Sequence, residues 1–323
     1  MPLDPRVKRF LDALAAGKPP NALDTSVAQR RLGLTELMKL AGPETVVRRI
    51  EDRTLPGPAG PLGVRIYTPL LTGQSLSADL SLSAGPQLLP GLIYFHGGGL
   101  VAGTVATHDS IARALANAGA CRVVSVEYRL APEHSFPAAL DDALAAVTHI
   151  GARAAEFGID GVRLGICGDS AGGTLAAATV QTVAQIGSPR LALQLLICPI
   201  LDYSRSTDSK RDLASGYLVD QATLDHDLLH YAPPGTDPAN PRISPLRAED
   251  VAGLPRTLIH TAEFDPLRDE GRDYFDRLAR AHTEVSYTCH PGMIHLFYGL
   301  GAVIPYARTA FEQIGREIRA ALA

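Results

Sequence analysis

The sequence predicts an α/β fold in which a mostly parallel central sheet is flanked by helices on both faces. From Gly91 onward, apolar runs of strand length alternate with stretches of helical length. The apolar runs show no regular polar alternation, which is typical of strands covered on both faces. In such sheets the functional residues collect at the carboxyl ends of the strands. We therefore expect the site in the loops that follow those strands.

Composition narrows the class of protein. The chain has 323 residues, 46% hydrophobic and 20% charged, which suits one large α/β domain with an appended cap, or two ordinary domains. The formal net charge is -4 and no basic block is present, so neither nucleic acid nor a membrane surface is an expected partner. The first 20 residues lack a signal-peptide core, and no apolar run reaches the roughly 18 residues needed to span a bilayer, so we expect a cytoplasmic protein without membrane insertion.

Four cysteines occur without a CxxC pair or a zinc-type spacing, which predicts free thiols in a reducing compartment and no metal site. They are Cys121, Cys167, Cys198 and Cys289.

The first 50 residues are expected to form an N-terminal helical cap segment. Apolar residues recur there at helical spacing, first at Val7, Phe10, Leu11 and Leu14 and then at Leu34, Leu37, Met38 and Leu40. Gly63–Pro69 alternates as a strand does. Residues 71–90 are rich in Leu, Ser, Gly and Pro, so we expect a surface loop or hairpin there.

Residues 51–323 are expected to form the main domain. Its later strands are predicted at Leu92–Phe95, Arg122–Glu127, Arg163–Cys167, Leu193–Cys198, Thr257–Ala262 and Val285–Cys289. Its helices are predicted at Asp109–Ala118, Pro137–Phe157, Ala171–Ile186, Asp269–Ala281 and Tyr306–Leu322. Residues 202–250 hold five prolines and interrupt the alternation, so we expect a cap insertion above the site.

A candidate nucleophile lies in Gly168-Asp169-Ser170-Ala171-Gly172, which matches G-x-S-x-G. A predicted strand precedes this segment and a small-residue helix follows it. A sharp strand-to-helix turn would lift the Ser170 hydroxyl into the site, and the glycines leave room for the crowded backbone. The alternatives are a plain glycine turn or a phosphate cradle. The cradle lacks support, because neither G-x-G-x-x-G nor a P-loop lysine is present.

His96-Gly97-Gly98-Gly99 follows the strand Leu92–Phe95. Consecutive glycines leave backbone N–H groups unshielded, as an oxyanion hole requires. We expect Gly97 and Gly98 to donate to the oxyanion together with the N–H of Ala171. The alternative is a flexible turn with no chemical role.

These motifs resemble the bacterial hormone-sensitive-lipase family (family IV) of carboxylesterases over roughly residues 60–320. The matching segments are His96–Gly99, Tyr128–Glu133, Phe136–Ala139, Gly168–Gly172 and Asp265–Asp269. The resemblance implies an α/β-hydrolase fold with a helical cap. It also implies a serine carboxylesterase that cleaves short-to-medium acyl esters through an acyl-enzyme, without metal or cofactor. Relatives are often dimers through an edge strand, so a homodimer is expected.

The fold supplies the acid and the base after the serine. Asp265 follows the strand Thr257–Ala262 and is the expected acid. Two acidic neighbours compete with it. Asp269 suits the first turn of the next helix better, and Glu263 suits a supporting position.

His295 is the expected base, because it follows the last predicted strand and precedes the last helix. His290 is the rival and lies nearer the strand end. The resemblance favours His295. Among the other histidines we expect His96 to brace the glycine turn and His226 and His230 to be surface or lid residues, and none has a metal-ligand spacing.

Substrate contacts are expected from Leu100, Tyr203, Tyr217 and Leu218. Two other functions remain open at this point: an amidase or peptidase on the same triad, and a non-catalytic receptor that binds a small molecule in the same fold. Receptors of this kind typically lack a triad member, whereas all three are present here. Fold alone does not separate the enzymatic alternatives.

Overall fold

The computed structural model describes residues 2–71 and 88–323. A loop or hairpin was predicted at residues 71–90, of which residues 72–87 lie outside the described part of the chain. Its last two residues, Leu89 and Pro90, already belong to a strand.

The described residues form one eight-stranded sheet in the order β1-β2-β4-β3-β5-β6-β7-β8. β1 pairs antiparallel with β2 and β2 with β4, whereas every later pairing is parallel. The predicted, mostly parallel α/β-hydrolase fold is thereby confirmed. The strands are β1 (Arg49–Gly57), β2 (Gly60–Thr68), β3 (Leu89–Phe95), β4 (Arg122–Val126), β5 (Ile159–Asp169), β6 (Leu193–Ile197), β7 (Arg256–Phe264) and β8 (Val285–Ile294).

The sheet is buried on both faces because its side chains alternate between two cores. On β3, Ile93 and Phe95 join one apolar cluster, and Leu92 and Tyr94 join the other. All four side chains are fully buried. A strand with two apolar faces lacks polar alternation, which explains the pattern in the sequence.

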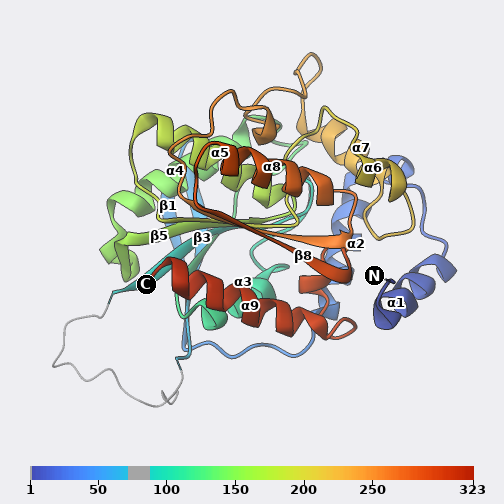
Figure 1. Cartoon of the computed structure of the whole chain (residues 1–323), viewed down its shortest axis with the longest axis horizontal. Helices are drawn as coiled ribbons and strands as arrows, with labels where there is room; N and C mark the ends of the chain where they lie inside the picture. The colour runs from blue at the N-terminus through green and yellow to red at the C-terminus, as the bar shows by residue number, and fades with distance from the viewer. Residues whose placement is uncertain (1, 72–87) are drawn as a thin grey trace.

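Helices form a layer on each face (Figure 1). One layer holds α4 (Ala138–Ala152), α5 (Ala171–Ile186) and α8 (Arg268–Arg280), and the other holds α3 (Asp109–Gly119) and α9 (Tyr306–Ala321). The helix predicted over Pro137–Phe157 is shorter than expected. It ends because Arg153 leaves helical geometry at φ -134° and ψ 30°, and a short 3-10 helix follows.

Four further helices gather at one end of the sheet in Figure 1: α1 (Pro5–Ala16), α2 (Val27–Met38), α6 (Asp208–Asp212) and α7 (Gln221–Tyr231). α2 begins at a capping box, in which Ser26 and Gln29 satisfy each other's backbone N–H groups. Thr25 and His226 join the start of α2 to α7, with His226 Nε2 3.2 Å from the Thr25 carbonyl oxygen. Short 3-10 helices complete the chain at Ala22–Asp24, Lys39–Ala41, Ala154–Phe157, Pro245–Arg247 and Phe297–Gly299.

Candidate active site

Ser170 occupies a strained turn between β5 and α5. β5 ends at Asp169, α5 begins at Ala171, and Ser170 itself has φ 52° and ψ -124°. Its backbone is fixed on both sides, because its N–H donates to the Ile197 carbonyl at 2.9 Å and its carbonyl accepts from Ile200 N at 3.1 Å. Strain of this kind persists only where the surroundings hold it, and it is concentrated at functional sites.

Two glycines make the turn sterically possible. A Cβ at Gly168 would lie 2.1 Å from the Gly172 carbonyl oxygen, and a Cβ at Gly172 would lie 2.0 Å from that of Phe95. Neither approach is tolerable for a real side chain. The glycines of the motif are therefore required by close backbone packing.

The structure brings Ser170, His295 and Asp265 together. His295 directly follows β8, and Asp265 directly follows β7. His295 Nδ1 lies 2.8 Å from Asp265 Oδ2, and His295 Nε2 lies 3.0 Å from Ser170 Oγ. A carboxylate only accepts hydrogen bonds, so Nδ1 carries the proton and Nε2 is left to accept the Ser170 hydroxyl. Leu267 N fixes the other carboxylate oxygen at 2.9 Å.

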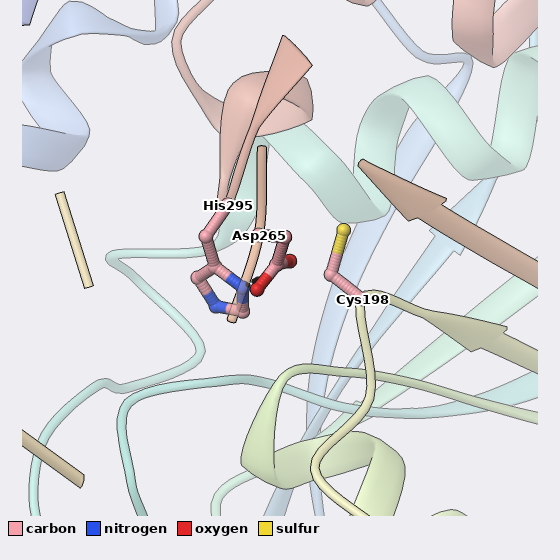
Figure 2. Close-up of side chains that lie close together, drawn as sticks. All are labelled: Cys198, Asp265 and His295. Carbon is pink, nitrogen blue, oxygen red and sulfur yellow. Dashed lines mark hydrogen bonds and ion pairs between the residues drawn. The ribbon is translucent and has the colours of Figure 1, made fainter. Parts of the chain in front are cut away.

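Figure 2 shows the His295 imidazole directed at the Asp265 carboxylate, with Cys198 on the far side of that carboxylate. The thiol, carboxylate and imidazole ligand atoms lie within 4.8 Å of one another, a spacing that a metal ion would accept. However, Asp265 already accepts the imidazole proton. Burial, and then the nearby Asp265 charge, raises the pKa of the Cys198 thiol well above its usual range. A protonated thiol is a poor ligand, so the chemistry of this group does not favour a metal.

The residues that competed with Asp265 and His295 for the roles of acid and base do not contact Ser170 among the described residues. Asp269 is in the first turn of α8 and accepts from Ser209 N at 2.7 Å, and Glu263 accepts from Gly292 N at 2.7 Å. His290 lies 3.2 Å from both His260 Nδ1 and the Tyr306 hydroxyl, and has no contact with Ser170 among the described residues.

The glycine turn requires one correction. Gly97 was expected to be an oxyanion donor, but its N–H donates to Asp169 Oδ1 at 3.0 Å and is not free. Gly98 and Gly99 have φ values of +119° and +68°, which only glycine adopts cheaply. No acceptor for either N–H exists among the residues that the structure describes. The two free amides of the turn are therefore those of Gly98 and Gly99, beside the amide of Ala171 at the start of α5.

Asp169, the variable residue of the G-x-S-x-G segment, is a functional residue that sequence reasoning missed. Its fully buried carboxylate accepts from the Tyr94 hydroxyl at 2.5 Å and from Gly97 N at Oδ1, and from the Tyr298 hydroxyl at 3.1 Å at Oδ2. Desolvation raises the pKa of Asp169 despite these donors. The carboxylate ties the glycine turn to the strand that carries Ser170.

His96 braces the turn, as the sequence suggested. Its Nδ1 lies 2.8 Å from the Gly97 carbonyl oxygen, and its ring stacks between those of Tyr128 and His108 at 4.4 and 5.1 Å. Burial, and then the neighbouring His108, lowers the pKa of His96 to about 3, so its imidazole is neutral at pH 7.

A cavity of about 570 Å³ opens onto Ser170 and His295. Its walls come from the glycine turn, from α2 and the loop before it, and from residues 218–227 around the start of α7. The side chains that line it include Leu34, Leu37, His108, Ile200, Leu218, Val219, Leu224 and Leu296.

Of the expected substrate contacts, only Leu218 lines this cavity. Leu100 is fully buried in the core beneath α4 and α5. The Tyr203 ring packs into the same core, and the Tyr217 ring stacks on Phe264 with centroids 5.7 Å apart. These three expectations are wrong because each side chain points into packed protein, which position along the chain does not reveal.

The helices α2 and α7 contribute two charged residues that no motif indicated. Arg30 of α2 and Asp227 of α7 both line the cavity and form an ion pair at 2.8 Å. His226 was expected to be a surface or lid residue, but it is 2% exposed and lies 3.1 Å from the Asp227 carboxylate. His230 is half-buried on the same helix.

Within the described residues, none of the helices combines the length and the apolar character that crossing a membrane demands.

Comparisons with known proteins agree with this geometry. A family model described as alpha/beta hydrolase fold matches residues 92–299. Carboxylesterase NlhH of Mycobacterium tuberculosis (strain ATCC 25618 / H37Rv) is 36% identical over 98% of this chain and 95% of its own length. An ethyl acetate hydrolase of Pseudomonas putida is 34% identical over 95% of each chain.

Solved structures agree as well. An ester-hydrolase from the metagenome of Lake Arreo superposes with a TM-score of 0.91 and 38% identity over 98% of each chain. A hyperthermophilic esterase from the archaeon Pyrobaculum calidifontis superposes with a TM-score of 0.90 and is 34% identical, over 100% of each chain. The resemblance found in the motifs is thus confirmed over nearly the whole length. The chain therefore belongs to the alpha/beta-hydrolase family that these esterases represent, and it is a carboxylic ester hydrolase.

Proposed function

We propose that this enzyme hydrolyses esters of short-to-medium acyl chains, with Ser170 as nucleophile, His295 as base and Asp265 as the acid that orients the imidazole. One observation carries the assignment: the Ser170 hydroxyl lies 3.0 Å from His295 Nε2 while Nδ1 is held at 2.8 Å by Asp265. This arrangement activates a hydroxyl that is otherwise a weak nucleophile.

The reaction proceeds in two acyl transfers. His295 Nε2 takes the Ser170 proton while Oγ bonds to the ester carbonyl carbon. The imidazolium then protonates the leaving alcohol as its C–O bond breaks, which leaves an acyl-enzyme. Water repeats the sequence and releases the acid. Asp265 stabilises the imidazolium at both stages.

The amides of Gly98, Gly99 and Ala171 would stabilise the tetrahedral oxyanion. Two of these free donors come from the glycine turn, and the third sits at the N-terminus of α5, where the helix dipole favours negative charge. Gly97 has a supporting part in this proposal, because its N–H is committed to Asp169.

The nucleophile is tested by a fluorophosphonate label with mass mapping of the adduct. We expect the label on Ser170 and a loss of about 10⁴-fold or more in kcat for S170A. The exposed Ser206, which lies outside the cavity lining, provides the control variant S206A. Full ester hydrolysis by S170A would refute the assignment.

Acyl-chain preference is proposed from the family resemblance. The cavity of about 570 Å³ has room for a small ester together with its alcohol. The relative named as an ethyl acetate hydrolase also supports short acyl chains. We expect faster turnover of acetyl to hexanoyl nitrophenyl esters than of the hexadecanoyl ester, and a maximum at long chains would refute the preference.

Three broader features belong to the proposal. Residues 1–50 and 202–250 act as the cap, which is supported by the cavity contacts of Arg30 and Asp227. A homodimer through the edge strand β8 is supported by its outer position in the sheet. A cytoplasmic location is supported by four cysteines that all remain free thiols.

A further inference from the structure

A buried carboxylate packs directly on the glycine turn. Asp227 is 3% exposed, and a Cβ at Gly99 would lie only 1.8 Å from Asp227 Oδ2. The carboxylate therefore rests against the Cα of Gly99, beside one of the amides proposed to hold the oxyanion. Asp227 and Gly99 line the same cavity as Ser170.

This position is electrostatically unfavourable for the reaction. The transition state places a negative charge on the carbonyl oxygen, and a buried carboxylate packed on the same glycine turn opposes that charge with little screening by water. The enzyme needs a compensating positive charge if Asp227 is to remain there.

Arg30 supplies that charge from the other cap segment. Its Nη2 donates to Asp227 Oδ2 at 2.8 Å and its Nε to Oδ1 at 3.2 Å, so the contact is bidentate. The Arg30 side chain is 18% exposed and that of Asp227 5%. His226 is the third partner, with Nδ1 3.1 Å from Oδ1. No other charged group touches this carboxylate among the residues that the structure describes.

We infer that Arg30 is a positioning residue for ester hydrolysis: it holds the Asp227 carboxylate paired and neutralised against Gly99, so that the oxyanion forms without facing a bare negative charge. The inference rests on the proposed function of the glycine turn. Through Asp227, α2, a helix of the N-terminal segment, then affects the energy of the transition state.

A purely mechanical role makes different predictions. Arg30 and Asp227 join α2 to α7, so the pair could serve only to fasten two parts of the cap. Removing either partner would then have equal effects, and removing both would add nothing. In the electrostatic case the two single variants differ, because only the loss of Arg30 leaves the Asp227 carboxylate without its guanidinium partner.

The test measures kcat and KM for nitrophenyl butyrate with R30M, D227N and the double variant R30M/D227N. We expect R30M to lose about tenfold or more in kcat with KM changed by less than about threefold. D227N should lose far less, because a positive charge then faces the oxyanion. The double variant should recover most of the activity that R30M loses, and R30K should lose less than R30M because it keeps the charge.

A matched control lies one residue along α2. Arg31 pairs with Glu133 at 2.6 Å outside the cavity, so E133Q removes an ion pair of the same helix and should keep wild-type kcat. Thermal midpoints separate unfolding from the catalytic effect. Equal losses in R30M, D227N and the double variant, or wild-type kcat in R30M, would overturn the inference. The fluorophosphonate adduct on Ser170 of the wild type is measured separately. Its absence would contradict the proposed function, whereas the kinetics of the Arg30 and Asp227 variants test only the inference.

Discussion

At the scale of single residues, Asp169 shows how a buried side chain supports the site without reacting. It accepts three hydrogen bonds, from Tyr94, Gly97 and Tyr298, and has no exposure to water. Removing the acceptor leaves buried donors unsatisfied, each at a cost of about 1–3 kcal/mol. It also frees the N–H of Gly97, so the glycine turn loses the contact that fixes it to β5.

We therefore predict that D169A lowers the free energy of unfolding by about 3 kcal/mol or more and kcat by about tenfold or more. Y298F removes one donor and keeps the contact with Gly97, so it should lose about 1 kcal/mol and little activity. Urea unfolding and nitrophenyl butyrate kinetics measure both quantities. A D169A enzyme with wild-type kcat would show that the turn does not depend on this carboxylate.

Asp169 also shows which features of the site the sequence predicts and which it does not. That Ser170, Asp265 and His295 meet was expected from the sequence, because each follows a predicted strand and the carboxyl ends of parallel strands share one edge. The choice of His295 over His290 came from the family resemblance, because the strand pattern alone places His290 nearer the strand end. The engagement of Gly97 was not predictable, because it depends on where the Asp169 side chain turns within the elbow. Leu100, Tyr203 and Tyr217 failed for a similar reason, since chain position does not reveal which way a side chain packs.

At the scale of elements, the strands were predictable from β3 onward, with boundaries that differ by a few residues. β5 begins at Ile159 rather than Arg163, because Gly161 and the exposed Val162 break the apolar run there. The arrangement of α2 and α7 was less predictable. These helices lie far apart in the sequence, and no local pattern indicates that Arg30 of one pairs with Asp227 of the other.

α2 carries Arg30 and Leu34 to the cavity, so the start of this helix should matter to catalysis. Ser26 accepts from Gln29 N at 3.3 Å, and Gln29 Oε1 accepts from Ser26 N at 2.8 Å. S26A removes this cap and should lower the free energy of unfolding by about 1 kcal/mol. We also expect a raised KM for butyrate esters, because α2 frays at the end that borders the cavity.

The matched control is the cap of α1, a helix outside the cavity lining. Asp4 accepts from Arg6 N at 2.7 Å and from Val7 N at 3.3 Å. D4A should cost about as much stability as S26A but leave KM unchanged. Equal KM values in the two variants, at similar loss of stability, would separate the start of α2 from substrate binding.

At the scale of the whole molecule, the response of stability to acid should follow from histidines that the fold buries in their neutral form. Burial is the main cause in each case. It lowers the pKa of His96 and His290 to about 3 and that of His108 to about 4. In the unfolded chain these groups titrate near 6.5. Between these values the unfolded state binds more protons, so stability is full above about pH 6.5 and falls as the pH is lowered.

His290 is the best test of this response, because it lies outside the proposed catalytic groups. The lowered pKa of His290 alone should reduce the free energy of unfolding by about 2 kcal/mol between pH 7 and pH 5. H290Q removes the titrating group, so its stability should fall less steeply over that interval, whatever its absolute value at pH 7. H134Q, at an exposed position, should keep the wild-type slope. Urea unfolding at pH 7, 6 and 5 gives the slopes, and an unchanged slope in H290Q would mean that acid acts on the fold through other groups.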